Sequence, residues 1–412
     1  MLLKLARASL WNRRGTIALT LFTIALSVAL LLAVERLREG ARRGFASSVS
    51  GTDLVVGART SPLQLLLYSV FHIGDASANL RWDSYEVIAA LPEIRFAIPI
   101  TLGDSHRGYR VLGTEVGYFE HFRHGRRQAL VFAAGRAFAG AQEVVLGAEV
   151  ARQLRYRIGD SLVIAHGGGR HDILRHDEAP FRVVGVLAAT GTPVDRTLHV
   201  SLESLEAIHA DWRHGVRLPG SANHAEAAPR TLSAVFLGLH NRAAALGLQR
   251  RINEYTGEPL LAILPALTLA QLWSLTAVAE NALRLVAACV VLAGLLGLCG
   301  ALLTALEQRR RELAILRALG ARPWQIAALL LIESGAITLA GAVAGALLLV
   351  LTLAAAGPWL LAEYGVPVAP LAFTPREACL LALVLAAGLA AGLLPAWRAW
   401  RRTLADGLTL RT

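Results

Sequence analysis

Glu307-Gln-Arg-Arg-Arg-Glu312-Leu-Ala-Ile-Leu-Arg317-Ala-Leu-Gly320-Ala-Arg-Pro323 is a basic segment that separates two long runs of apolar residues. Leu313 and Leu316 fall on one face of a helix with this spacing, while the charged side chains take the other faces. Gly320 suits the end of a helix, and Pro323 can open the next one because its missing N–H would have no partner there. The segment therefore predicts a short amphipathic helix, over residues 307–323, between two membrane spans.

Four apolar runs are long enough to cross a membrane, which takes roughly 20 residues. The first run is uncharged and passes into residues 35–39, a polar stretch that continues the helical pattern. A cleaved signal peptide is the alternative, but its apolar region would have only about 7–15 residues. We therefore expect an uncleaved anchor whose helix continues as a stalk. The expected spans are residues 15–34, 285–306, 324–356 and 378–397.

Basic residues predict the orientation of these spans, because arginine and lysine mark the cytoplasmic side. They gather before the first span, between the second and the third, and after the fourth. We therefore expect residues 1–14, 307–323 and 398–412 in the cytoplasm. The segments expected in the periplasm of a bacterial inner membrane are residues 35–280, a stalk and a large domain, and the short loop 357–377.

Composition excludes several functions. The mean hydropathy of +0.49, with only 17% charged residues, is typical of a chain with membrane spans. The net charge of +11 does not indicate nucleic acid, because much of the excess flanks the apolar runs. A P-loop needs a lysine at its end, and Lys4, the only lysine, cannot complete one. We therefore expect no enzyme activity and no cofactor in this chain, with ATP bound by a partner subunit.

The external segment has the pattern of a folded domain in which strands and helices alternate. This alternation predicts an α/β or α+β fold rather than an all-β one. The predicted class is therefore a membrane protein of four transmembrane helices with a large periplasmic α/β (α+β) domain inserted between helices 1 and 2. The expected strands are residues 143–147, 161–165 and 181–187, the expected helices 148–154 and 201–209, and the expected loop 215–230.

One apolar run in the external segment, residues 62–71, is too short to span a membrane. We expect it to belong to the core of the domain. The alternative is that it lies against the outer leaflet or contacts a lipophilic substrate.

Several of these segments together resemble a known family. Residues 309–321, followed by Gln325 and Glu333, resemble the signature of FtsX-like permeases, which include MacB, LolC and LolE. The ending Pro395-Ala-Trp-Arg398-Ala is similar to the usual Pro-Ala-x-Arg-Ala of that family. Pieces of the external segment resemble the periplasmic domain of the family: residues 135–138, 143–147, 158–160, 183–186 and 190–195. The resemblance covers nearly the whole chain in the right order.

The resemblance implies a mechanotransmission subunit of an ABC transporter. In this family the short cytoplasmic helix couples to an ATPase, and closure of the ATPase is relayed through spans one and two to the periplasmic domain. The chain lacks the fused ATPase of MacB and resembles LolC and LolE in that respect. The alternative for the basic segment is an orientation signal alone. The residues expected to contact the ATPase are Arg309, Arg311, Glu312, Leu313, Ile315, Leu316, Arg317 and Gly320.

Glu333 is an ionisable residue inside the third span, roughly 15 Å along the helix. Such a group is costly in a bilayer and usually faces protein or water. Similar permeases have a glutamate here without ion coupling, so we expect a structural carboxylate, with a proton or ion site as the alternative.

Small residues in the spans predict close approach of helices. The sequence leaves open whether these faces meet within one chain or across a dimer. The expected packing glycines are the pairs Gly341/Gly345 and Gly388/Gly392, together with Gly294, Gly297 and Gly300 of the second span.

All twelve histidines fall between His72 and His240, inside the external domain. The spacing of His121 with His124, and of the group around His176, is too loose for a metal site. We expect solvated loop histidines, no metal and no catalytic residue.

The main functional hypothesis is therefore an ABC permease that works on periplasmic or membrane-embedded cargo, such as lipoprotein release or efflux. An FtsX-like regulator that activates an envelope enzyme without transport is the alternative, and a secondary transporter using Glu333 is disfavoured by the four-span layout. The expected partners are an ABC ATPase subunit, a second permease copy that completes a dimer, a periplasmic adaptor or lipoprotein, and membrane lipid.

Overall fold

The computed structural model describes residues 14–48, 50–166, 180–209, 212–213, 216–217, 231–308, 315, 317–318, 320–364 and 373–401. The chain divides into two compact units. The first, here called the membrane unit, comprises Met1–Gly40, Ala277–Leu360 and Val368–Thr412. The second, the mixed-sheet unit, comprises Ala41–Thr276 and Leu361–Pro367. Each is described by itself.

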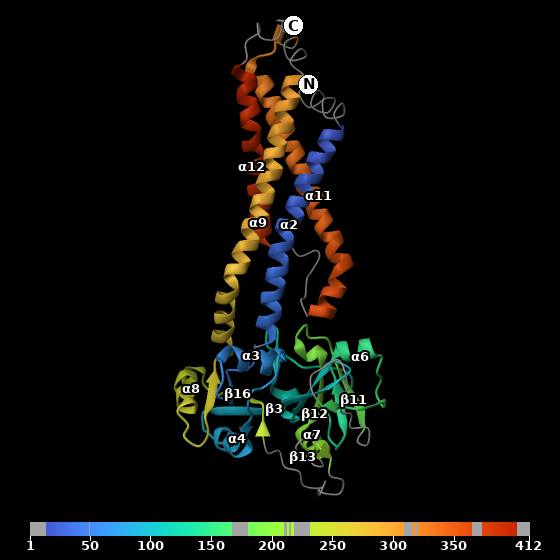
Figure 1. Ribbon diagram of the computed structural model, residues 1–412, viewed down its shortest axis with the longest axis vertical. Coiled ribbons are helices and arrows are strands. Elements are labelled where there is room, and N and C mark those ends of the chain that lie inside the picture. Colours follow the sequence, from blue (N-terminus) through green and yellow to red (C-terminus); the bar gives the residue numbers. More distant parts are fainter. Residues whose placement is uncertain are drawn as a thin grey trace. The chain divides into compact units, whose positions relative to one another are not determined.

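Four long apolar helices confirm the four predicted spans. Each is longer than the roughly 20 residues that a bilayer requires. The helix of the first span continues without a break through residues 35–39, as the predicted stalk requires. The helices, drawn from blue to red in Figure 1, are α2 (Arg14–Ser48), α9 (Pro265–Gln308), α11 (Pro323–Tyr364) and α12 (Pro375–Arg401).

Helix α11 continues past the predicted end of the third span. A loop was expected over residues 357–377, yet α11 continues through Pro358 to Tyr364, whereas its stretch apolar enough to cross a membrane ends at Gly357. A proline removes only one hydrogen bond from the helix, and the apolar residues that follow it extend the same helix.

The core of the membrane unit lies where α2 meets the other spans. Val28, Leu32 and Leu298 are fully buried there. Ser27 on α2 bonds across to α9, its hydroxyl donating to the carbonyl oxygen of Val290 at 3.2 Å. In a bilayer such packing and polar contacts, rather than the hydrophobic effect, hold neighbouring helices together.

An eleven-stranded mixed sheet forms the second unit. The strand order is β17-β1-β16-β3-β4-β12-β8-β11-β7, with β10 beside β3 and β9 beside β11. Two neighbours, β12 with β4 and β11 with β8, are parallel, and the other pairs of this sheet are antiparallel. Mixed pairing with interspersed helices confirms the predicted α/β (α+β) class.

The strands of the main sheet are β1 (Leu54–Ala58), β3 (Ile94–His106), β4 (Tyr109–Thr114), β7 (Phe132–Gly135), β8 (Glu143–Leu146), β9 (Ser161–Leu162), β10 (Ala165–His166), β11 (Phe181–Leu187), β12 (Thr197–Ser201), β16 (Ala234–Leu239) and β17 (Leu260–Ile263). Three two-stranded pairs accompany it, formed by β2 (Leu80–Arg81) with β15 (Thr231–Leu232), β5 (Arg123–His124) with β6 (Gln128–Ala129), and β13 (Trp212–Arg213) with β14 (Val216–Arg217). The helices are α3 (Pro62–Phe71), α4 (Trp82–Ala89), α5 (Gly117–His121), α6 (Ala148–Leu154), η1 (Pro193–Arg196), α7 (Leu202–His209), η2 (Arg242–Ala244) and α8 (Ala245–Asn253).

Two of the predicted elements of this unit need correction. Residues 161–165 form no single strand, because β9 pairs with β11 whereas β10 pairs with β3. The predicted loop 215–230 contains β14, while most of it lies outside the described residues.

The short apolar run at residues 62–71 belongs to the core of this unit. It forms α3, whose Leu65 and Leu66 have no exposed surface. The phenol of Tyr68 donates to the carbonyl oxygen of Ser233 at 3.1 Å, so even its polar atom is satisfied inside the protein. The core interpretation is therefore confirmed, and the alternative of contact with the outer leaflet is excluded for these side chains.

Candidate functional site

Arg317 fixes the end of the predicted coupling segment to α12. Its Nη2 donates to the carbonyl oxygens of Ala399 and Trp400, both at 3.2 Å. These are among the last carbonyls of α12, which have no partner within the helix, and the C-terminal end of the helix dipole favours a cation. Arg317 therefore caps the C-terminal end of α12. Among the described residues of the segment, Ile315 is apolar and has 59% of its surface exposed.

A capping interaction also fixes the turn from this segment into α11. Gly320 has φ of +95°, a left-handed conformation that glycine adopts without strain, and its N–H donates to the carbonyl oxygen of Arg317 at 3.0 Å. The Oε1 of Gln325 accepts from the backbone N–H of Arg322 at 2.9 Å, half of a capping box at the start of α11. The other expected contact residues, Arg309, Arg311, Glu312, Leu313 and Leu316, lie outside the described residues.

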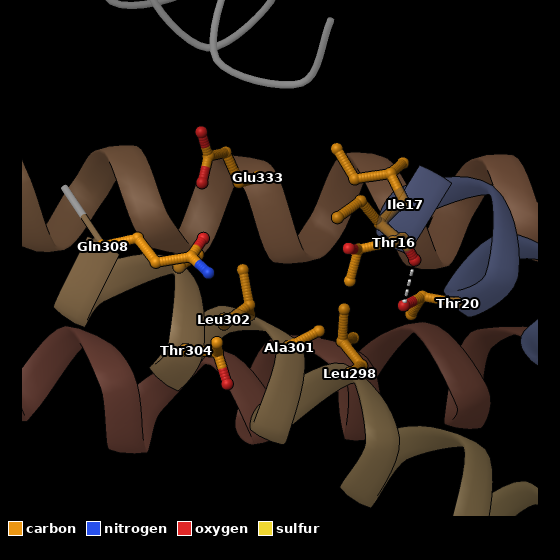
Figure 2. A pocket seen from close by; sticks show the side chains of 11 residues that line it. Thr16, Ile17, Thr20, Leu298, Ala301, Leu302, Thr304, Gln308 and Glu333 are labelled. Atoms are coloured by element: carbon orange, nitrogen blue, oxygen red, sulfur yellow. Dashed lines mark hydrogen bonds between the residues drawn. The ribbon is translucent and has the colours of Figure 1, made fainter. Parts of the chain in front are cut away.

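Glu333 lies at a small pocket of about 70 Å³ within the membrane unit. Glu333 is only 3% exposed to solvent. Figure 2 shows Glu333 and Gln308 at one end of the pocket, and Thr16 and Thr20 of α2 at the other. The volume suffices for one or two water molecules, given polar partners such as these. Glu333 thus faces protein rather than lipid, the placement expected of an intramembrane carboxylate.

Both predicted glycine pairs pack within one chain. A Cβ at Gly345 would lie 2.5 Å from the carbonyl oxygen of Ala25 on α2, and one at Gly341 would lie 2.6 Å from Ile24. Gly388 on α12 is equally close to Thr338 on α11, where a Cβ would lie 2.3 Å from the hydroxyl oxygen. Gly392 continues that face.

Within the described part of this chain only one of the three glycines in the second span packs closely, and packing of the other two across a dimer stays a prediction. A Cβ at Gly294 would lie 3.2 Å from the hydroxyl oxygen of Ser27, whereas Gly297 and Gly300 have nothing within 4 Å. A spacing of three residues rotates around the helix, so one neighbour cannot contact all three.

Charged residues tie α2, α9 and α12 together. Glu35 on α2 pairs with Arg376 on α12 at 3.0 Å and lies 3.6 Å from Arg284 on α9. Arg38 joins α2 to α9, because it pairs with Glu35 of its own helix at 2.9 Å and with Glu280 at 2.6 Å. Residues 35–39 were predicted only as a polar stalk, and the pairing of their charges with α9 and α12 was not predicted from the sequence.

The most deeply buried pair of this cluster is Arg36 with Glu377, whose Nε and Oε1 are 2.7 Å apart. Their side chains are 5% and 1% exposed. The ring of Phe373 lies under the guanidinium, 4.9 Å from its carbon. Glu377 also completes a capping box at the start of α12, since its carboxylate accepts from the N–H of Thr374 and its N–H donates to the Thr374 hydroxyl.

The described histidines of the mixed-sheet unit form no metal site, and no group of three ligand side chains occurs among the described residues. The imidazole of His199 is fully buried between Tyr118 and Phe119. Burial lowers its pKa to about 3, with the neighbouring His72 adding to the shift. His72 bonds Thr197 at 2.9 Å, and burial lowers its pKa to about 4. His199 is a core group rather than the expected loop residue, whereas His72 is partly buried in the loop that follows α3.

Two families match this chain. The MacB-like periplasmic core domain matches residues 17–234, and the FtsX-like permease C-terminal domain matches residues 284–404.

Curated relatives include two proteins named Pyoverdine export ATP-binding/permease protein PvdT. The one from Pseudomonas savastanoi pv. phaseolicola is 25% identical, covering 97% of this chain and 58% of the relative. The one from Pseudomonas aeruginosa is 24% identical, covering 97% of this chain and 57% of the relative. The chain thus spans less than two thirds of the length of these relatives.

Among solved structures, the periplasmic region of MacB from Actinobacillus actinomycetemcomitans aligns with a TM-score of 0.35 and 11% identity, covering 55% of this chain and 95% of that one. The extracellular domain of the ABC-type transporter YknZ from Gram-positive bacteria aligns with a TM-score of 0.31 and 13% identity, covering 51% of this chain and 98% of that one.

Proposed function

Because the chain belongs to the family of FtsX-like permeases with a MacB-like periplasmic core domain, we propose that it is the permease subunit of an ABC transporter and couples ATP hydrolysis to work in the periplasm. The ATP is bound and hydrolysed by an ATPase that lies outside these residues. This proposal is supported by the lysine content, since Lys4 cannot complete a P-loop.

The observation that carries the proposal is the anchoring of the last described part of the segment 307–323 to α12 and α11. Arg317 bonds the end of α12, and Gln325 caps the start of α11. A segment fixed in this way moves with the helices to which it is attached, which is what a mechanical coupling element needs. An orientation signal alone needs no such contacts.

In the proposed mechanism, ATPase closure pushes on the segment 307–323 and the displacement passes to the membrane helices. Contacts of α2 with its neighbours then distribute the displacement, because Arg36 and Glu377 join α2 to α12 and Arg38 joins it to α9 through Glu280. We place the chain in a bacterial inner membrane, as a dimer with a second copy or a similar permease. The mixed-sheet unit then acts on periplasmic cargo, and the names of the curated relatives favour export-type work over release of a lipoprotein.

The test is a charge placed on the apolar face of the segment. We expect Leu316→Asp to insert normally into the membrane but to lose ATPase association by several-fold or more, because an unpaired charge in a buried contact is strongly disfavoured. Ala318→Asp is the matched control, since Ala318 is exposed and lies two residues along the same segment. Co-purification of each tagged variant with its partner ATPase provides the measurement.

Wild-type association of Leu316→Asp would refute the coupling assignment. If association is lost only in that variant, cargo export assayed in cells distinguishes a transporter from an FtsX-like regulator. A regulator would instead fail to activate an envelope enzyme while moving no cargo.

A further inference from the structure

The last turns of α12 have one face packed inside the membrane unit and another face exposed. Ala396 and Ala399 are buried in an apolar cluster with residues of α9 and α11. Leu393, Trp397 and Trp400 lie on another face of the same turns, where each is just over half exposed. The exposed face is thus large, apolar and aromatic, and it has no partner within the described part of the chain.

The residues of this face change in a fixed order toward the C-terminal end of α12. Leu389 and Leu393 come first, Trp397 and Trp400 follow, and Arg401 ends the helix. At 1.5 Å per residue the stretch from Leu389 to Arg401 is roughly 18 Å long. One leaflet contributes about 15 Å of hydrocarbon, and tryptophan is enriched where the hydrocarbon meets the headgroups. The face therefore presents hydrocarbon, interface and positive charge in the order in which a phospholipid presents acyl chain, glycerol ester and phosphate.

Two arginines supply the charge at the headgroup end. The guanidinium of Arg401 lies over the ring of Trp397, 4.9 Å from its centroid, so the cation is held at the depth of the indole. Arg398 is exposed three residues earlier. Neither arginine is needed to cap the helix, because Arg317 already donates to the last carbonyl oxygens of α12. Both guanidinium groups are therefore available to an anion.

We propose that this face binds one anionic phospholipid of the leaflet in which α12 ends. Its phosphate would accept hydrogen bonds from Arg398 and Arg401, and one acyl chain would lie along Leu393 and Leu389. Guanidinium and phosphate form strong charge-assisted hydrogen bonds, and basic residues beside a membrane span attract anionic lipid.

The charges of this face disfavour a protein occupant. A second copy that docked through the same face about a two-fold axis would bring identical arginines together, and like charges across an interface are costly. A water-soluble partner could reach Arg401, but the leucines of this face lie within the span, where lipid surrounds them.

Photolabelling tests this proposal with the full chain in vesicles of phosphatidylcholine containing a minority of phosphatidylglycerol. The probe is phosphatidylglycerol with a diazirine on an early carbon of one acyl chain, and the same probe with a phosphatidylcholine headgroup is compared with it. Mass spectrometry maps the labelled residues. Arg401→Gln removes the charge that lies over Trp397. Arg322→Gln is the matched control, since Arg322 is an exposed arginine just before α11 and is not on this face of α12.

In the wild type we expect residues 389–401 to be labelled roughly tenfold more by the phosphatidylglycerol probe, which corresponds to about 1.4 kcal/mol. Arg401→Gln should lower this ratio several-fold, Arg398→Gln together with Arg401→Gln should abolish the preference, and Arg322→Gln should leave it unchanged. Equal labelling by the two probes in the wild type, or a preference that survives the double substitution, would overturn the proposal. So would a loss in Arg322→Gln as large as that in Arg401→Gln, because general basic charge would then explain the preference. The test requires no ATPase, so its failure leaves the proposed transport function untouched.

Discussion

Removing the charge of Glu377 should destabilise the membrane unit by about 3 kcal/mol, because it leaves the guanidinium of Arg36 buried without its carboxylate. The pair is 2.7 Å apart and its side chains are 5% and 1% exposed, so solvent screens it little. Such losses run to about 3–5 kcal/mol, and we take the lower end because the ring of Phe373 also contacts the cation. Glu377→Gln is the cleanest change, since glutamine preserves the capping box with Thr374.

A double-mutant cycle measures this interaction. Removing both charges, in Arg36→Met with Glu377→Gln, should bring stability back to within about 1 kcal/mol of the wild type. Arg376→Ala is the control, because its pair with Glu35 is largely exposed on the arginine side and should contribute no more than about 1 kcal/mol. Unfolding by SDS in mixed micelles, followed by circular dichroism, reads mainly the membrane helices. If Glu377→Gln costs no more than the control, or the double variant is no more stable than the single one, the reasoning is refuted.

Three further outcomes are expected. Arg317→Ala should fray the C-terminal end of α12, because it removes the cap on the last carbonyl groups. Amide hydrogen exchange of residues 393–401 should become several-fold faster, while membrane insertion stays normal. Unchanged exchange would exclude the cap. Folding lowers the pKa of His72 to about 4 and that of His199 to about 3. Below about pH 6.5 the unfolded chain therefore binds more protons than the folded chain. The folded state should lose stability as the pH falls from about 6.5 toward these folded pKa values. The loss for His199 should reach roughly 2 kcal/mol at pH 5, and a melting curve of His199→Leu that keeps the full pH dependence would contradict this. A single cysteine at position 176 should react with an impermeant reagent in intact cells, and reaction only after lysis would reverse the predicted topology.

The sequence predicts an element of this structure well when residues close in the chain determine it, and poorly when distant residues do. The helix at 148–154 and the strand at 181–187 have the predicted bounds, because spacing and β-branched content determine them within a few residues. Residues 161–165 were predicted wrongly as one strand, because their division depends on two different neighbours, β11 and β3. Those neighbours are distant in sequence, so no local pattern reports them.

The candidate site shows the same limit. Close approach at Gly341 and Gly345 was predictable from spacing, but their partner, α2 of the same chain, was not. The charged cluster left a signal that could have been found: residues of both signs occur at the ends of three spans, at 35–39, 280–284 and 376–377. Spans that begin or end at one membrane face place such residues at the same depth, where opposite charges pair rather than stay unpaired.

The contacts of α2 bear directly on how a displacement could travel through the membrane unit. Helix α2 packs on α11 through the glycines at 341 and 345, bonds α9 through Ser27, and pairs with α12 through Arg36. It cannot slide along one neighbour without breaking contacts with the other two. Close glycine packing resists axial sliding. A one-residue shift would place a larger side chain where a Cβ at Gly341 or Gly345 would already lie within 2.6 Å of atoms of α2. A push delivered near Arg317 should therefore move the four helices together, with the buried Arg36–Glu377 pair carrying force between α12 and α2. Weakening that pair by Glu377→Gln should then reduce coupling even where the ATPase still binds, which separates force transmission from assembly.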